Sequence, residues 1–71
     1  MSDPKINVEK ALAEAAELVG GWKELCYKLD RTRQAMSIWE KANSVPADKA
    51  KEIEEMTDGK VPRTKLNEVF L

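Results

Sequence analysis

Three polar residues in the middle of the chain, Arg33, Gln34 and Ser37, are of types that could recognise a nucleic acid. An arginine guanidinium can donate two hydrogen bonds to O6 and N7 of guanine, and a glutamine amide can pair in the same bidentate way with N6 and N7 of adenine. On a helix, Ser37 would lie one turn beyond Arg33 on the same face. Base reading of this kind requires an element that holds all three side chains outward.

The sequence around this trio predicts a helix over residues 32–41. Thr32 is suited to cap it, because a threonine hydroxyl can accept a backbone N–H from the first helical turn, and the same hydroxyl could reach a phosphate. Lys41 falls on the outer side with the trio. An apolar stripe marks the inner face, and it consists of Ala35, Met36 and Trp39.

A second short helix is predicted over residues 22–29, with its inward positions at Trp22, Leu25, Cys26 and Leu29. Asp30-Arg31 would end it, since aspartate tolerates the left-handed backbone region better than most residues. Two short helices joined by a turn of three or four residues are typical of the helix-turn-helix motif. Cys26 and Ala35 would be the small residues at the helix crossing. Other helical hairpins share this spacing, so it leaves them open as alternatives.

The rest of the sequence predicts further helices. Asn7 can cap a helix over residues 7–19, and Gly20-Gly21 would end it. Pro46 suits the first position of a fourth helix, and Asp58-Gly59 would end that one. We therefore predict an all-α, compact bundle that forms a single domain over residues 1–71, with residues 1–6 as a flexible N-terminal segment.

Residues 60–71 leave two structures open. A helix that begins at Pro62 would pack Leu66, Val69 and Phe70 inward, whereas an extended arm or strand hairpin would not. Pro62 cannot donate a hydrogen bond to a strand ladder, which favours the helix. With this fifth helix, the prediction is a bundle of five short helices.

Composition narrows the possible functions. The chain has no histidine and one cysteine, Cys26, so neither an internal disulfide nor a Cys/His zinc site can form. No nucleophile–base pair supports an enzyme. No apolar run approaches the roughly 18 residues of a membrane span, and the polar N-terminus is unlike a signal peptide. We expect a soluble intracellular protein that is not an enzyme and uses no metal, cofactor or small-molecule ligand.

The net charge of −1 argues at first against DNA binding, because DNA-binding domains are usually basic. The charge is unevenly distributed, however. Residues 1–22 carry −2 and residues 42–71 carry −1, while residues 23–41 hold five basic and three acidic side chains, a net +2. Binding depends on the local field more than on the total. Lys23, Lys28 and Lys41 could contact phosphates or simply provide solubility.

Several motifs at fixed spacing resemble the Cro and YdaS-like regulators of lambdoid phages and prophages. The similarity covers nearly the whole chain from the first predicted helix onward. It is carried by Gly20-Gly21, Leu25-Cys26, the segment LDRTRQAMSIW from Leu29 to Trp39, Val45-Pro46-Ala47, Ile53-Glu54 and Gly59-Lys60-Val61.

This resemblance implies a lambda-repressor-like DNA-binding fold and a Cro-type repressor of the bacterial host cytoplasm, associated with the nucleoid. Such proteins act as small dimers on pseudo-palindromic operators, so the expected partners are double-stranded operator DNA and a second, weakly bound copy. The implied base-reading residues are Arg33, Gln34, Ser37 and Ile38. The implied backbone contacts are Thr32, Lys41 and Asn43, to which the basic segment adds Lys23 and Arg31.

The chain departs from the family pattern at a few positions. Trp22 replaces a glutamine that contacts a phosphate, and either packing or DNA contact remains open for it. Asp30 replaces the turn glycine, and Ile38 replaces a lysine, where it could touch a thymine methyl. The alternative function is a protein-interaction module, such as an antitoxin-like prophage protein, that uses the acidic first and fourth helices.

Overall fold

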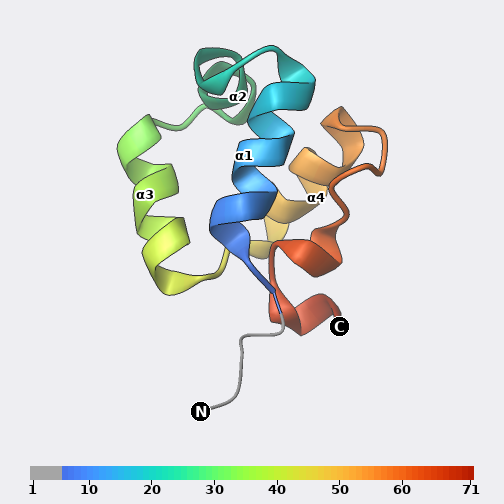
Figure 1. Ribbon diagram of the computed structural model, residues 1–71. Helices are drawn as coiled ribbons and strands as arrows, with labels where there is room; N and C mark the ends of the chain where they lie inside the picture. Colours follow the sequence, from blue (N-terminus) through green and yellow to red (C-terminus); the bar gives the residue numbers. More distant parts are fainter. Residues whose placement is uncertain (1–5) are drawn as a thin grey trace.

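The computed structural model describes residues 6–71 (Figure 1). Its elements are α1 (Val8–Val19), α2 (Trp22–Leu29), α3 (Arg33–Ala42), α4 (Ala47–Met56) and two short 3-10 helices, η1 (Arg63–Lys65) and η2 (Glu68–Phe70). In Figure 1, α1 runs through the centre, α2 lies across one end, and α3 and α4 flank α1 on opposite sides. No strand occurs in residues 6–71. The predicted all-helical class is confirmed.

The helix α1 is capped at both ends, by Asn7 and by Gly20. The side chain of Asn7 accepts a hydrogen bond from the amide of Lys10, which confirms the predicted N-terminal cap. Gly20 has a φ of 108° and ends α1 through its N–H to the Ala16 carbonyl, in a conformation that favours glycine. The buried stripe of α1 consists of Val8, Ala11, Leu12, Ala15 and Ala16. α1 packs against both α2 and α3.

The end of α2 confirms the predicted turn at Asp30. This residue has φ 55° and ψ 46°, in the left-handed region, and its N–H bonds to the carbonyls of Cys26 and Tyr27. Thr32 then caps α3, because its Oγ1 accepts a hydrogen bond from the amide of Ala35 at 3.2 Å. Only Asp30, Arg31 and Thr32 separate the two helices.

The C-terminus of α3 is tied to the start of α1. α3 continues through Ala42, one residue beyond the predicted end, and Asn43 ends it with a φ of 53°. The Asn43 side chain donates to the carbonyl of Ile6 and accepts from the amide of Val8, each at 2.9 Å. The predicted flexible segment at residues 1–6 lies outside the described residues except for Ile6, which is buried.

The fourth helix starts one residue later than predicted. Pro46 is the residue before the helix, with an extended ψ of 143°, and Ala47 takes the first helical position. The chain is extended here because the amide of Val45 donates to the carbonyl of Leu66 at 2.8 Å. At the other end, Asp58 and Gly59 turn the chain with φ of 55° and 80°, as predicted.

The predicted fifth helix is wrong: η1 and η2 take its place. Asn67 separates them, because its side chain donates to the carbonyl of Val45 and accepts from the amide of Val69. Leu66 is buried as predicted and Phe70 packs partly against the core. Val69 is 73% exposed, contrary to the prediction, since Asn67 turns the chain before it.

Candidate nucleic-acid interface

The two short helices predicted to carry the site lie side by side and share buried contacts. Of the seven residues predicted to face inward on these helices, four are buried and three, Trp22, Cys26 and Ala35, are half-buried. The Sγ atom of Cys26 lies 3.9 Å from Sδ of Met36, which places the small residue of α2 against the inner face of α3. The four buried residues are Leu25, Leu29, Met36 and Trp39.

The outward face of α3 is held by this packing. Gln34, Ile38 and Lys41 are all exposed, and their spacing of four and three residues places them on one side of the helix. Ile38 is 62% exposed although it is apolar. Ser37 is half-buried at the edge of this face. The amide of Gln34, the apolar side chain of Ile38 and the ammonium group of Lys41 are therefore accessible to a binding partner on one face of α3.

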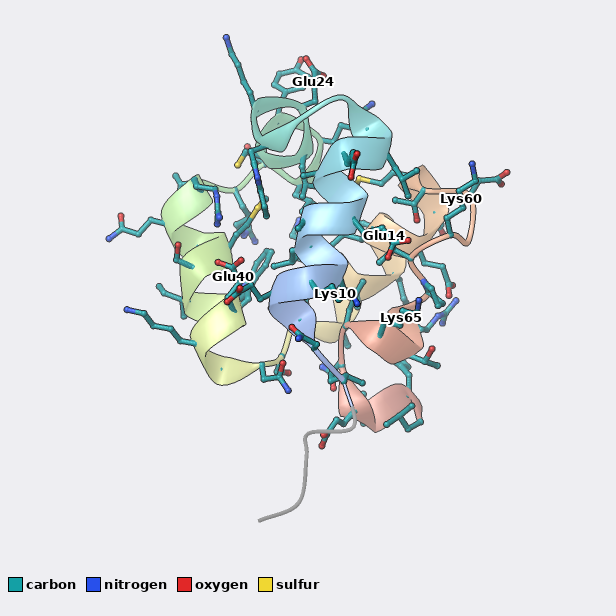
Figure 2. All side chains as sticks on the ribbon, in the orientation of Figure 1. Lys10, Glu14, Glu24, Glu40, Lys60 and Lys65 are labelled. Carbon is teal, nitrogen blue, oxygen red and sulfur yellow. The ribbon has the colours of Figure 1, made fainter. Side chains whose placement is uncertain are left out.

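Arg33 has two partners within the protein. Its guanidinium carbon lies 3.8 Å from the centroid of the Trp22 ring, a cation–π distance. Its Nη1 lies 3.3 Å from Oε1 of Glu40, two turns along the same helix. The side chain of Arg33 is 45% exposed and that of Glu40 is 14% exposed. Figure 2 shows Glu40 on the side of α3 that faces α1.

The sequence left open whether Trp22 packs within the protein or contacts DNA, and in the structure it packs. Trp22 is half-buried and packs against the core cluster at the start of α2, while its ring supports Arg33 of α3. Trp22 joins the two helices through Arg33, where the family pattern has a glutamine.

Two residues predicted to contact the DNA backbone, Arg31 and Thr32, directly precede α3, and a third, Lys23, lies in the first turn of α2. Lys23 is exposed at the start of α2. Arg31 is exposed in the turn, where its Nη1 donates to the carbonyl of Asp30 at 2.8 Å. Thr32 accepts the amide of Ala35, which leaves its hydroxyl hydrogen available to an acceptor. Arg31 and Thr32 line an open hollow of about 320 Å³ together with Cys26, Tyr27 and Asp30.

The fifth predicted backbone residue, Asn43, is placed differently. Both ends of its side-chain amide are engaged by the first residues of the fold, the carbonyl of Ile6 and the amide of Val8. Lys41 is exposed on the outer face of α3, two residues earlier. The geometry therefore gives Asn43 a structural role and leaves Lys41 open to solvent.

Two residues near the interface have roles that the sequence analysis missed. Lys49 of α4, with a side chain only 12% exposed, donates from Nζ to the carbonyl of Leu29 at 3.0 Å and pairs with Glu52 at 2.9 Å. It thereby satisfies the last carbonyl of α2. Glu40 was also missed, although its spacing of seven residues from Arg33 places the two on one helix face about 10 Å apart along the axis, within reach of a long arginine.

A second Arg–Glu pair lies in the C-terminal part of the molecule. Arg63 donates from Nε and Nη2 to Oε1 of Glu54, at 2.9 and 2.8 Å, and its backbone amide donates to Oε2 at 3.0 Å. These hydrogen bonds from the Arg63 side chain and backbone lower the pKa of Glu54 below its ordinary value of 4.5. The pair connects α4 to η1.

The fold and the interface define a small all-helical protein with one outward-facing helix supported by a second. A family model described as "Bacterial toxin YdaS" matches residues 12–68. Since this is well over half of the chain, the protein belongs to that family. Neither the curated proteins nor the solved structures include a match to the chain.

Residues 6–71 contain neither a membrane-spanning helix nor a cluster of metal ligands. No helix in this range is long and apolar enough to cross a membrane. No group of three or more His, Cys, Asp or Glu side chains in the same range is arranged to hold a metal ion.

Proposed function

We propose that this protein is a sequence-specific, DNA-binding regulator of transcription that inserts α3 into the major groove of an operator. The observation that carries the proposal is the outward face of α3. Gln34, Ile38 and Lys41 are exposed on one side, while Met36 and Trp39 are buried on the other. A major groove about 12 Å wide admits one α-helix presented in this way.

Each exposed group on this helix has a counterpart in a DNA duplex. The amide of Gln34 is suited to N6 and N7 of adenine, and the exposed Ile38 to a thymine methyl. Arg33, at the first position of α3, is suited to guanine. Lys23, Arg31, Thr32 and Lys41 surround the helix with phosphate donors, which fix its register on the duplex without reading sequence. Ser37, half-buried at the edge of this face, is the remaining proposed base-reading residue.

The net charge of −1 limits the affinity of one copy of the protein for DNA. Phosphate neutralisation supplies much of the affinity of DNA-binding proteins, and the segment from Lys23 to Lys41 provides only a small positive excess. We propose that a weak homodimer on a pseudo-palindromic operator supplies the remaining affinity, as a repressor of the Cro type would in the bacterial cytoplasm. No catalytic step is part of this proposal.

Selection of bound duplexes from a random DNA pool tests the proposed function. One sequence, with two related half-sites, is expected to be enriched. Gln34→Ala should then lose about 1–3 kcal/mol of binding to the selected duplex and relax the preference at one base pair per half-site. Lys51→Ala, on the exposed side of α4, is the matched control and should keep both. A protein that enriches no sequence overturns the proposal.

The family description favours a second candidate function, that of a toxin or of a partner in a toxin–antitoxin pair. The contact surface would be acidic, since α1 exposes Glu9, Glu14 and Glu17. Under this candidate, DNA binding is secondary. The absence of measurable affinity for nonspecific duplex even at low salt would support it.

Growth measurements separate the two candidates in the cell. If induced expression slows growth through binding to DNA, a double variant with Arg33→Ala and Gln34→Ala should abolish the effect. If the acidic surface is responsible, the double variant should still slow growth, and Glu14→Lys should not.

A further inference from the structure

Arg33 occupies the first position of α3, yet in the free protein its guanidinium is held between Trp22 and Glu40. We propose that Glu40 competes with DNA for Arg33, so that Arg33 is released to a guanine but withheld from phosphates. Trp22 and Glu40 are then positioning residues that set specificity. This inference rests on the proposed function and identifies residues that regulate the same site.

The geometry first shows that the guanidinium remains accessible to DNA. The Arg33 side chain is still 45% exposed while it contacts both partners. The Trp22 ring covers one face of the guanidinium at 3.8 Å. A guanidinium has five N–H donors in its plane, and ring stacking leaves these edges free. Arg33 can therefore turn toward a duplex without any change in the fold.

The ion pair with Glu40 is weak enough to exchange. It is a single contact of 3.3 Å, longer than the roughly 2.7–2.9 Å of a strong charge-assisted hydrogen bond. The ion pair between Arg63 and Glu54 in the same molecule is tighter. It has two side-chain contacts of 2.8 and 2.9 Å and a backbone contact of 3.0 Å. Arg63 is fixed, whereas Arg33 is only restrained.

The competition acts differently on the two kinds of DNA contact. A guanine offers O6 and N7 together to one guanidinium, in a fixed bidentate geometry that exceeds the single bond to Glu40. A phosphate in a nonspecific complex offers a solvated and adjustable charge, and a surface carboxylate is a comparable partner. Glu40 therefore lowers nonspecific affinity more than specific affinity, which raises their ratio.

The test is a comparison of Glu40→Gln with Asp30→Asn. Both changes remove one negative charge, at residue 40 beside the Arg33 guanidinium and at residue 30 in the turn before α3, and asparagine tolerates the left-handed conformation of residue 30. Glu40→Gln should raise affinity for a nonspecific duplex about two- to fivefold, the range expected for a surface ion pair. It should also steepen the slope of log K against log salt by about 0.9, one added phosphate contact. Preference for guanine at the Arg33 position should relax.

The same pair of changes in an Arg33→Met background completes the double-mutant cycle. Without the guanidinium, Glu40→Gln should have no effect beyond that of Asp30→Asn. If Glu40→Gln acts equally with and without Arg33, or never exceeds Asp30→Asn, the inference is overturned. A wild-type protein that binds no duplex at low salt overturns the proposed function instead, so the two failures are distinguishable.

Nuclear magnetic resonance of the free protein provides a second measurement that needs no DNA. The Nη1–H signals of Arg33 should be shifted by the Trp22 ring and slowed in exchange by Glu40. Glu40→Gln should speed this exchange severalfold while backbone amide signals of α3 away from residue 40 stay in place. An Arg33 signal that is already averaged in the wild type would overturn the inference, and a collapse of the backbone spectrum would show that the variant does not fold.

Discussion

Asn43 caps α1 across 35 residues of sequence, because its Oδ1 accepts a hydrogen bond from the amide of Val8 at 2.9 Å. Its Nδ2 donates at the same time to the carbonyl of Ile6. One side chain at the end of α3 thus closes the N-terminus of the helix that runs through the centre of the molecule. These two hydrogen bonds connect the end of α3 to the start of α1.

Asn43→Gly and Asn43→Ala separate the two contributions of this residue. Loss of the hydrogen bonds should lower the free energy of unfolding by about 1–3 kcal/mol in both variants. Alanine should cost roughly 1–2 kcal/mol more, because Asn43 has a φ of 53° and alanine is strained there. Urea denaturation measures both. A Gly variant as stable as the wild type would show that the side-chain bonds contribute nothing.

Thr57 is the buried polar residue that connects α4 to the C-terminal segment. Its Oγ1 donates to the carbonyl of Ile53 at 2.8 Å and accepts the amide of Val61 at 3.1 Å. Thr57→Val leaves the buried Val61 amide without this acceptor and should lower the unfolding free energy by about 1–3 kcal/mol. Thr57→Ser keeps the hydroxyl and should lose less. Equal urea midpoints for the two variants would contradict this assignment.

Lys49 of α4 stabilises the end of α2, because its Nζ donates a hydrogen bond to the Leu29 carbonyl. Lys49→Met keeps the aliphatic stem but removes the donor, and should lower the unfolding free energy by about 0.5–1.5 kcal/mol. Lys51→Met changes the same charge at an exposed position of α4 and should stay within about 0.5 kcal/mol of the wild type. Similar losses in both variants would assign the effect to charge rather than to the carbonyl contact.

The sequence predicted the local features of the fold well. The caps at Asn7 and Thr32 and the turn at Asp30 each depend on residues within a few positions, and the structure confirms all three. The burial of Met36 and Trp39 likewise follows from helical periodicity. Features of this kind are set by short-range sterics and hydrogen bonding, which a single sequence displays directly.

The features that the sequence did not predict depend on contacts between distant segments. Asn67 interrupts the expected fifth helix because it bonds to Val45, 22 residues earlier. A second bond between these segments, from the amide of Val45 to the carbonyl of Leu66, holds the chain extended before α4, which starts after Pro46. At the interface, the stack of Arg33 on Trp22 depends on the angle between α2 and α3, which spacing alone does not specify.

The ion pair between Glu54 and Arg63 makes stability depend on pH. The pKa of Glu54 is lowered in the folded protein by its hydrogen bonds from Arg63, so folding favours the ionised carboxylate. This contribution is fully present above the ordinary pKa of 4.5 and is lost as the pH falls through the lowered value.

Urea denaturation of Glu54→Gln between pH 7 and pH 3 measures this effect. The variant should be less stable than the wild type at pH 7, and the difference should shrink as the pH falls below 4.5. Glu55→Gln, at the exposed neighbouring position, is the control and should differ little from the wild type throughout. A difference for Glu54→Gln that stays constant down to pH 3 would contradict the assignment.

Lys41 tests the part of the proposed function that does not involve base reading. It is exposed on the outer face of α3, with Gln34 two turns before it, where an inserted helix would bring its ammonium group to a phosphate. Lys41→Ala should weaken binding to specific and nonspecific duplexes alike and reduce the salt slope by about 0.9.

Lys60→Ala is the matched control for this measurement, because Lys60 is exposed in the turn after α4, away from α3. Fluorescence anisotropy with a labelled duplex at several salt concentrations gives both slopes. If the two variants reduce the slope equally, the DNA senses only the total charge of the protein, and α3 is not its docking surface. If Lys41→Ala alone reduces it, the phosphate contact belongs to α3, and the acidic remainder of the chain is turned away from the duplex.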